Sequence, residues 1–265
     1  MNVNPGPISL YRRRRGRMLA LLAVLVACAG FVGVEHGFSS SQFTDISVNS
    51  TSGGTGGPEC KLRDAITAAN SGTTTGGCTV SGPEPYRVVF SIIDPIELTV
   101  VDNTTSNGDN GLPLITGEIT ILGQGNTILR SSKAGTPAFR LLEVDDGAAL
   151  TVENLHLENG AQPQKQGGGI YNAGSLYLRQ SHVSFSQAEK GGAILNAGLL
   201  TMTVTTLYHN QGASQGGAIQ NMGDLVAGSC LIGYNVGGCG GAINSSVGTT
   251  LSITHSTLTG NTAYI

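Results

Sequence analysis

One short phrase occurs four times in this chain, at intervals of 24 or 25 residues. The copies begin at Gly167, Gly191, Gly216 and Gly240, and each joins two glycines to a small residue and an isoleucine. A fixed period of this length is typical of a solenoid, in which each repeat packs on its neighbours because it cannot bury its apolar residues alone. The repeat therefore constrains the shape of the molecule and says little about its ligand.

A second phrase, an apolar residue followed three positions later by Asn, runs in step with the first. It ends at Asn210, Asn235 and Asn261, and we place Ser186 and Asn159 at the equivalent positions one and two repeats earlier. Asparagine is favoured at tight corners because it tolerates left-handed backbone angles. We expect a corner ladder in which side-chain amides bond between coils, formed by Asn159, Asn210, Asn235 and Asn261.

Alternating pairs of apolar residues precede these corners by ten positions. The pairs are Leu176/Leu178, Leu200/Met202, Leu225/Ala227 and Leu251/Ile253. A period of 2, without helical periodicity, predicts β-strands with one face inside. We expect the glycine pairs to permit tight corners and close approach of coils. The sequence therefore predicts an all-β chain, a parallel β-helix with about 24–25 residues per coil.

Composition agrees with this fold and divides the chain. Forty glycines in 265 residues, no Trp and only 12% charged residues are unlike a compact α/β enzyme.

We assign residues 1–29 to a signal peptide and residues 30–55 to a linker and first strand. An N-terminal cap follows over residues 56–82. The β-helix occupies residues 83–265, and its repeats are clearest in residues 150–265.

The N-terminus has the pattern of an export signal. Basic residues at 12–17 precede an apolar run at 18–26. Ala27-Cys28-Ala29 fits a signal-peptidase site, whereas residues 25–28 also resemble a bacterial lipobox, which would leave Cys28 lipidated. An uncleaved anchor is a third alternative. We expect an exported protein, located outside the cell or at the bacterial outer membrane or cell surface.

Removal of the leader makes the chain acidic. All 17 Asp and Glu residues lie beyond residue 29, and five of the 14 Lys and Arg residues lie before it, so the mature charge is 9 − 17 = −8. An acidic chain without a basic stripe disfavours nucleic acids and anionic membranes as partners. We therefore expect membrane contact only through the leader or a lipid anchor.

Two cysteines flank a short segment with helical periodicity. Its apolar residues recur on one helical face: Leu62, Ala65, Ile66 and Ala69. Exported chains meet oxidising surroundings, so we expect a Cys60–Cys78 disulfide that pins a short capping helix over the first coil. Cys230 and Cys239 lie in one coil, and the sequence is compatible either with a second disulfide or with two separate thiols. No Cys-x-x-Cys is present, so structural zinc is not expected.

The cap and the repeats together resemble known exported proteins. Residues 60–66, Cys-Lys-Leu-Arg-Asp-Ala-Ile, followed by Ala69-Asn70, resemble the CSLREA motif found near the start of exported bacterial β-helix proteins, with Lys61 for Ser and Asp64 for Glu. The two repeated phrases are similar to the repeats of chlamydial polymorphic outer membrane proteins, with Leu or Ile in place of Phe. The resemblance covers about residues 40–265.

This resemblance implies a right-handed β-helix of the pectin-lyase-like class at a bacterial surface, and an adhesin-like role. The last repeat ends close to Ile265. We expect the open C-terminal coil to offer unpaired strand edges for self-association. A fragment of a longer surface protein is a further alternative.

The main alternative function is that of a polysaccharide lyase or glycoside hydrolase. Such enzymes need a carboxylate cluster that binds calcium, or paired carboxylates. Beyond residue 167 the acidic residues are Glu189 and Asp224, which fall at different coil positions. Four others lie earlier in the chain: Asp145, Asp146, Glu153 and Glu158. We interpret Asp145-Asp146-Gly147 as a turn, and calcium there is the minor alternative.

Other polar residues are not expected to form a site. We interpret Asp102, Asn107, Asp109 and Asn110 as a solvated loop. Four histidines have different offsets from their corner residues and are therefore not expected to stack: His156, His182, His209 and His255.

Aromatic residues are few, and five of them are candidates for one weak strip: Tyr171, Tyr177, Phe185, Tyr208 and Tyr234. Phe185 fits the core equally well. Exposed tyrosines there would favour an adhesive surface. The sequence thus favours an adhesin-like or structural surface module with an unidentified surface ligand or polysaccharide as partner, and assigns no catalytic, cofactor-binding or metal-binding residue.

Overall fold

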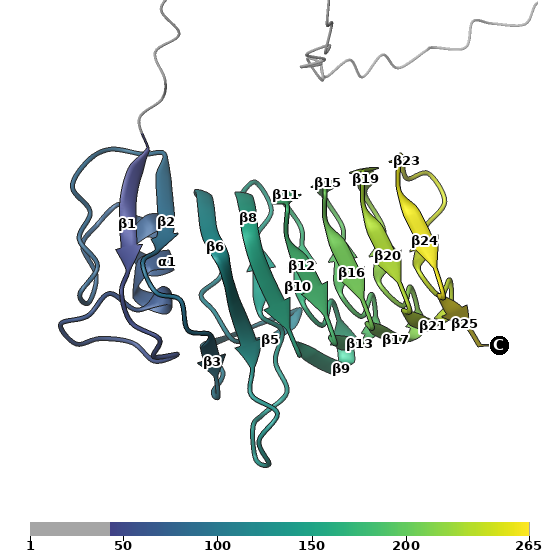
Figure 1. Ribbon diagram of the computed structural model, residues 1–265, viewed down its shortest axis with the longest axis horizontal. Coiled ribbons are helices and arrows are strands. Elements are labelled where there is room, and N and C mark those ends of the chain that lie inside the picture. Colours follow the sequence, from purple (N-terminus) through teal and green to yellow (C-terminus); the bar gives the residue numbers. More distant parts are fainter. Residues whose placement is uncertain (1–42, 265) are drawn as a thin grey trace, which may run out of the picture. The chain divides into compact units, whose positions relative to one another are not determined.

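The computed structural model describes residues 43–264, so the leader and Cys28 lie outside the described residues. These residues form a stack of parallel strands with a helix at its N-terminal end (Figure 1). The predicted fold, a parallel β-helix with a short N-terminal helix, is confirmed. Two five-stranded sheets and one 13-stranded sheet run along the stack.

The first sheet contains both halves of a bent face. Its strands are β1 (Thr44–Val48), β2 (Tyr86–Phe90), β3 (Ile96–Leu98), β6 (Glu118–Arg130), β8 (Ala149–Glu158), β11 (Ser175–Arg179), β12 (His182–Ser184), β15 (Leu199–Thr203), β16 (Thr206–Tyr208), β19 (Asp224–Gly228), β20 (Leu231–Gly233), β23 (Leu251–Thr254) and β24 (Thr257–Thr259). In the regular coils, β11, β15, β19 and β23 form one half and β12, β16, β20 and β24 form the other.

Two smaller sheets complete each coil. The second sheet consists of β7 (Leu142–Val144), β10 (Ile170–Asn172), β14 (Ile194–Asn196), β18 (Ile219–Asn221) and β22 (Ile243–Ser245). The third sheet consists of β9 (Ala161–Gln166), β13 (Gln187–Lys190), β17 (Gln211–Gln215), β21 (Val236–Cys239) and β25 (Thr262–Ala263). A separate antiparallel hairpin joins β4 (Asn103–Thr105) to β5 (Gly108–Asn110).

Each regular coil has a residue with left-handed backbone at three of its turns, which we call corners A, B and C. Corner A, between the halves of the first sheet, has Asn154, Gln180, Val204, Ser229 and His255. Corner B, between the first and third sheets, has Asn159, Phe185, His209, Tyr234 and Gly260. Corner C, between the third and second sheets, has Gly167, Gly191, Gly216 and Gly240. Left-handed backbone favours Gly, which explains the glycine that opens each phrase at corner C. The repeated residues Asn210, Asn235 and Asn261 are not in this region, so the expectation that they tolerate left-handed angles does not explain their positions.

The glycine phrases provide the close approach that their spacing predicted. The first glycine of each phrase occupies corner C. A methyl group on the second glycine would overlap main-chain carbonyl oxygens, for example those of Gln187 and Gly192 at Gly168. The phrases are therefore needed for the path of the backbone.

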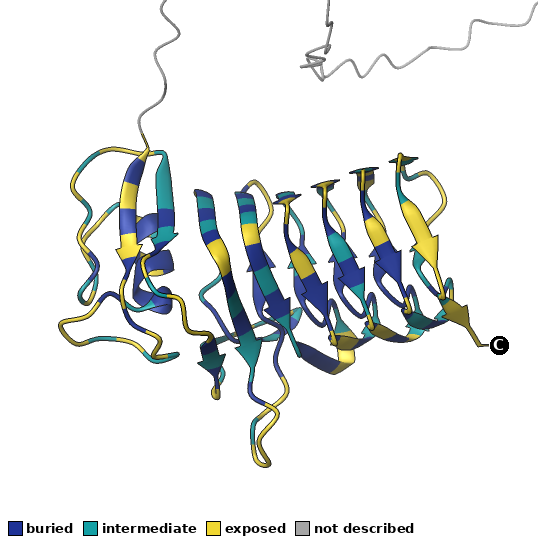
Figure 2. Cartoon of the chain, viewed as in Figure 1, coloured by how far each residue is buried: buried dark blue, intermediate teal, exposed yellow. Residues whose placement is uncertain are grey.

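Apolar side chains fill the interior of every coil. The predicted pairs point inward: Leu176 and Leu178 are fully buried, as are Leu200 and Leu225. Burial of one such side chain contributes about 1.5–3 kcal/mol. Exposure rises in the last described coil, where Leu251 is 44% exposed, and Figure 2 shows this change along β23 and β24.

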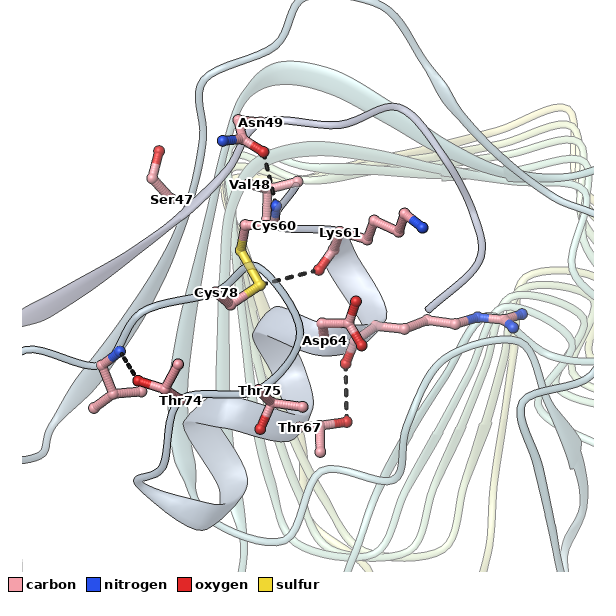
Figure 3. The surroundings of a disulfide bond; sticks show 12 residues. Ser47, Val48, Asn49, Cys60, Lys61, Asp64, Thr67, Thr74, Thr75 and Cys78 are labelled. Carbon is pink, nitrogen blue, oxygen red and sulfur yellow. Dashed lines mark hydrogen bonds between the residues drawn. A yellow bond between two sulfur atoms is a disulfide. The ribbon is translucent and has the colours of Figure 1, made fainter. Parts of the chain in front are cut away.

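The N-terminal end is closed by helix α1 (Leu62–Ser71) and the loops around it. Leu62, Ala65 and Ile66 are buried, and the helix ends at Gly72, whose φ is 65°. Cys60 and Cys78 form the expected disulfide, with a Cα–Cα distance of 4.4 Å (Figure 3). Cys230 and Cys239 are both free thiols, the first buried and the second exposed.

Polar residues of the CSLREA-like segment hold the cap in place. Arg63 donates to the carbonyl oxygens of Gly111 (3.0 Å) and Val100 (2.6 Å). Asp64 accepts from the main-chain nitrogen of Gly56 at 2.7 Å. Because Arg63 and Asp64 are buried and partnered, this segment acts in the fold of the cap.

Candidate functional site

An asparagine ladder lies on the inner side of corner B. It contains three of the four predicted members, Asn210, Asn235 and Asn261. Asn210 donates to Asn235 Oδ1 at 3.0 Å, and Asn235 donates to Asn261 Oδ1 at 2.9 Å. The main-chain nitrogen of Ser186 donates to Asn210 Oδ1 at 3.0 Å. These amides are satisfied by one another and by carbonyl oxygens, so they stabilise the stack and are not free to bind a ligand.

The fourth predicted member, Asn159, is wrong by one residue. Strands β8 and β12 pair His156 with His182, and β9 and β13 pair Ala161 with Gln187. Gly160 therefore lies beside Ser186 in the ladder row. Asn159 instead belongs to the left-handed row of corner B, with φ of 64°.

A second ladder joins the ends of the glycine phrases in the second sheet. Asn172 donates to Asn196 Oδ1 at 2.7 Å, and Asn196 donates to Asn221 Oδ1 at 2.8 Å. Asn221 then donates to Ser245 Oγ at 3.1 Å. These three asparagines are fully buried, so the asparagines at both repeated positions stabilise the interior of the coils.

The exposed side of corner B carries a row of aromatic rings. Phe185 and His209 stack with ring centroids 5.5 Å apart, and His209 and Tyr234 follow at 5.6 Å. Tyr208 packs edge-on against both His209 (4.3 Å) and Tyr234 (5.2 Å). Phe185 is 55% exposed and Tyr234 is 47% exposed, so these rings face solvent. We call Phe185, Tyr208, His209 and Tyr234 the aromatic strip.

The strip differs from the predicted one in two respects. Tyr171 lies on β10 in the second sheet and Tyr177 on β11 in the first, away from corner B. His209 was not predicted to belong, yet it occupies the central position. The exposure of Phe185 excludes the alternative that it is a core residue.

Two histidines lie directly beside each other in successive coils with their rings tilted by 47°, contrary to the prediction from their offsets. His156 and His182 are directly paired on β8 and β12, with ring centroids 4.4 Å apart. The misplacement of Asn159 caused this error, because the offsets of the two histidines are equal when Gly160 is taken as the corner residue. Burial lowers the pKa of His182, and the neighbouring His156 lowers it further.

The acidic residues considered for catalysis or calcium binding are dispersed. Asp146 and Gly147 form the predicted turn, and Asp145 and Asp146 are exposed. Glu189 lies on β13 in the third sheet and Asp224 on β19 in the first. Within residues 43–264 no group of three His, Cys, Asp or Glu side chains is arranged to hold a metal ion.

The polar segment predicted to be a solvated loop is instead the β4–β5 hairpin, which covers a buried ion pair. Asn110 is fully buried. Beneath the hairpin, Arg140 Nη1 lies 2.8 Å from Glu143 Oε2, and both side chains are almost completely buried. A buried ion pair is stable only when further hydrogen bonds replace the lost water.

The hairpin supplies these hydrogen bonds. Glu143 accepts from Thr105 Oγ1 at 2.9 Å and from the side-chain amides of Asn107 and Asn110, both at 2.8 Å. Arg140 Nη2 donates to the carbonyl oxygen of Asn107. The ion pair therefore fixes the hairpin tip against the β-helix.

Tyr171 completes this cluster from the next coil. It is paired with Glu143 between β10 and β7, and its ring lies 5.1 Å from the Arg140 guanidinium carbon. Burial raises the pKa of Tyr171, and the charge of Glu143 raises it further. Arg140 and Glu143 were not found from the sequence. The sequence signal for this ion pair is weak, because it consists only of two opposite charges on either side of Leu141-Leu142.

Comparisons of the chain with protein-family models, with curated proteins and with solved structures found no match. Among the described residues, no helix is long and apolar enough to cross a membrane. Function is therefore inferred from the arrangement of the chain's own residues.

Proposed function

We propose that the protein is an exported, adhesin-like surface module that binds an extracellular polysaccharide through the aromatic strip. The strip follows the stacking direction of the coils, with Phe185, His209 and Tyr234 at successive turns of corner B. The aromatic surface that Phe185 and Tyr234 leave exposed can pack against the apolar faces of sugar rings. A linear row of rings suits a linear polymer.

The observation that carries the proposal is the row of exposed aromatic rings at the left-handed positions of corner B. Phe185, His209 and Tyr234 all have φ of 54°, in the left-handed region where Gly or Asn is favoured. Gly260 and Asn159 occupy the same row in other coils. Residues held in this region cost about 1–3 kcal/mol each and cluster at functional sites. Because Gln180 and Val204 at corner A adopt the same conformation, what distinguishes corner B is that its left-handed positions carry exposed aromatic rings.

Sequence features support the location. The leader pattern favours export, and the resemblance to CSLREA-motif proteins and to polymorphic outer membrane proteins favours a pectin-lyase-like β-helix at a bacterial surface. The mature charge of 9 − 17 = −8 favours a sugar over a nucleic acid as the ligand. Polysaccharide cleavage is the alternative, and the dispersed carboxylates do not favour it.

Substitution of the strip by asparagine separates binding from folding. The triple variant Phe185→Asn, His209→Asn and Tyr234→Asn removes the rings while it places a favoured residue at each left-handed position. We expect affinity for the bound polysaccharide to fall about tenfold or more, because each stacked ring contributes about 0.5–1.5 kcal/mol. Thermal stability should stay unchanged or rise.

The matched control is Gln180→Asn with Val204→Asn at corner A, where Asn154 already occupies the same row. Affinity electrophoresis through gels that contain single polysaccharides measures both variants. Equal retention of the triple variant and the wild type, with both folded, would contradict the proposal. A loss shared by the control would show that corner B has no special role.

A further inference from the structure

Two depressions flank the tip of the β4–β5 hairpin, and neither belongs to the aromatic strip. The smaller, of about 120 Å³, is lined by Ser106, Asn107, Lys165, Gln166 and Tyr171. The larger, of about 330 Å³, lies at the lower end of the range for ligand pockets, roughly 300–1,000 Å³. Lys165 lines both depressions. The hairpin tip and the end of β9 therefore form one bipartite pocket.

We propose that this pocket binds an acidic saccharide, with the carboxylate of one sugar in the smaller part and a neighbouring neutral sugar in the larger part. The proposal does not depend on the aromatic strip. It concerns a separate surface, formed by the hairpin, β9 and β10.

The smaller part is suited to an anion. Lys165 is exposed and makes no ion pair within residues 43–264, where its Nζ lies 3.4 Å from the carbonyl oxygen of Ser106. Beneath it, the charges of Arg140 and Glu143 offset each other at 2.8 Å. Lys165 thus supplies the net positive charge of this part, and the hydroxyls of Ser106 and Tyr171 add donors.

The larger part is suited to uncharged hydroxyl groups. Asp109 accepts from Thr104 Oγ1 at 2.6 Å through Oδ1, and its Oδ2 makes no hydrogen bond within the described residues. A free carboxylate oxygen accepts from sugar hydroxyls and repels an anion. Gln164 and Thr104 line the same part and can both donate and accept. Lys165 lines both parts, but Asp109 offsets its charge only in the larger part, so the pocket favours an acidic sugar in the smaller part beside a neutral one.

The walls of the pocket are rigid, which lowers the entropic cost of binding. Asn107 is fixed by its side chain to Glu143 (2.8 Å) and by its carbonyl oxygen to Arg140. On the other side, Gln162 donates to the carbonyl oxygen of Asp109 at 2.6 Å. A buried ion pair that costs desolvation energy is retained where it fixes one geometry, and here that geometry is the hairpin tip.

The probe is a hyaluronan tetrasaccharide, in which glucuronate alternates with a neutral sugar. Its carboxyl-reduced form, with glucose in place of glucuronate, serves as the uncharged counterpart. Isothermal titration of the intact protein at low salt should show binding of the acidic form at least about tenfold tighter, because a charge-assisted hydrogen bond is lost in the reduced form. Inorganic phosphate should compete only weakly.

The variant Lys165→Gln should abolish the preference for the acidic form. Lys190→Gln is a stringent control, because Lys190 is partly exposed on β13 beside Gln166 and makes no ion pair within the described residues, but does not line the pocket. The asparagine triple variant of the strip should bind the tetrasaccharide like the wild type, which separates this site from the proposed adhesive function.

Three results would overturn the proposal. They are equal binding of the acidic and reduced tetrasaccharides, an equal loss in Lys190→Gln, and displacement by phosphate at lower concentration than by the acidic sugar. Absence of binding to the tetrasaccharide would also overturn it, provided that the protein is folded by circular dichroism.

Discussion

The regular coils (residues 170–263) and the hairpin segment (residues 103–166) bury polar side chains in different ways. In the regular coils, the buried amides of the two ladders meet asparagines of the next coil, as Asn196 meets Asn221. In the hairpin segment, unlike groups meet, and Glu143 binds Arg140, Thr105 and two asparagines. Repetition makes the first arrangement robust, whereas the second depends on every partner.

The largest expected effect follows removal of one charge from the buried ion pair. Glu143→Gln leaves the Arg140 charge buried without compensation and should lower the free energy of unfolding by about 3–5 kcal/mol. Urea denaturation followed by circular dichroism measures the change. Asp45→Asn is the control, because Asp45 and Arg87 form an ion pair on the surface, where such pairs contribute about 0–1 kcal/mol. Similar costs for both substitutions would show that the buried ion pair in the hairpin segment matters no more to stability than a surface pair.

A smaller effect distinguishes the ladder row from the left-handed row of corner B. Asn235→Gly removes amide hydrogen bonds to buried partners and should cost about 1–3 kcal/mol. Asn159→Gly should be nearly neutral, because glycine adopts the φ of 64° at this position without strain. Urea denaturation of the two variants tests the corrected register. Equal costs would show that Asn159 shares the ladder after all.

The smallest effect concerns the paired histidines. Because the pKa of His182 is lowered from 6.5 in the folded protein, the unfolded chain binds a proton more readily. Stability should therefore fall as the pH drops below about 6.5, and this contribution should level off below the folded pKa. His182→Thr, which places the residue of the next coil at this position, should make the loss between pH 7 and pH 5 smaller. An unchanged pH profile would contradict the lowered pKa.

Repetition also explains what could be predicted from the sequence. The inward pairs such as Leu176/Leu178 and the close approach at Gly168 follow from local patterns that recur in every coil. Asn159 lies 27 residues before Ser186, whereas the paired residues His156 and His182 are 26 apart, and Gly160 at the true ladder position has no side chain to mark it. That one shift misplaced Asn159 and hid the histidine pair.

The hairpin segment could not be predicted for a different reason. Its interactions join residues distant in sequence, such as Thr105 and Glu143, and none of them is repeated in another coil. In the sequence, Asn107 and Asp109 are residues of the types that are common in solvated loops. Only the three-dimensional structure shows that they form the wall of a pocket around a buried charge.

We predict that this β-helix binds polysaccharides without cleaving them. To test this directly, the intact protein is incubated with a panel of polysaccharides, with and without calcium. Two quantities are measured: retention of the protein on each polymer and release of reducing ends. We predict retention on at least one polymer and no release above that of a heat-denatured control. Sustained release by the folded protein would contradict the account and establish a polysaccharide-degrading enzyme.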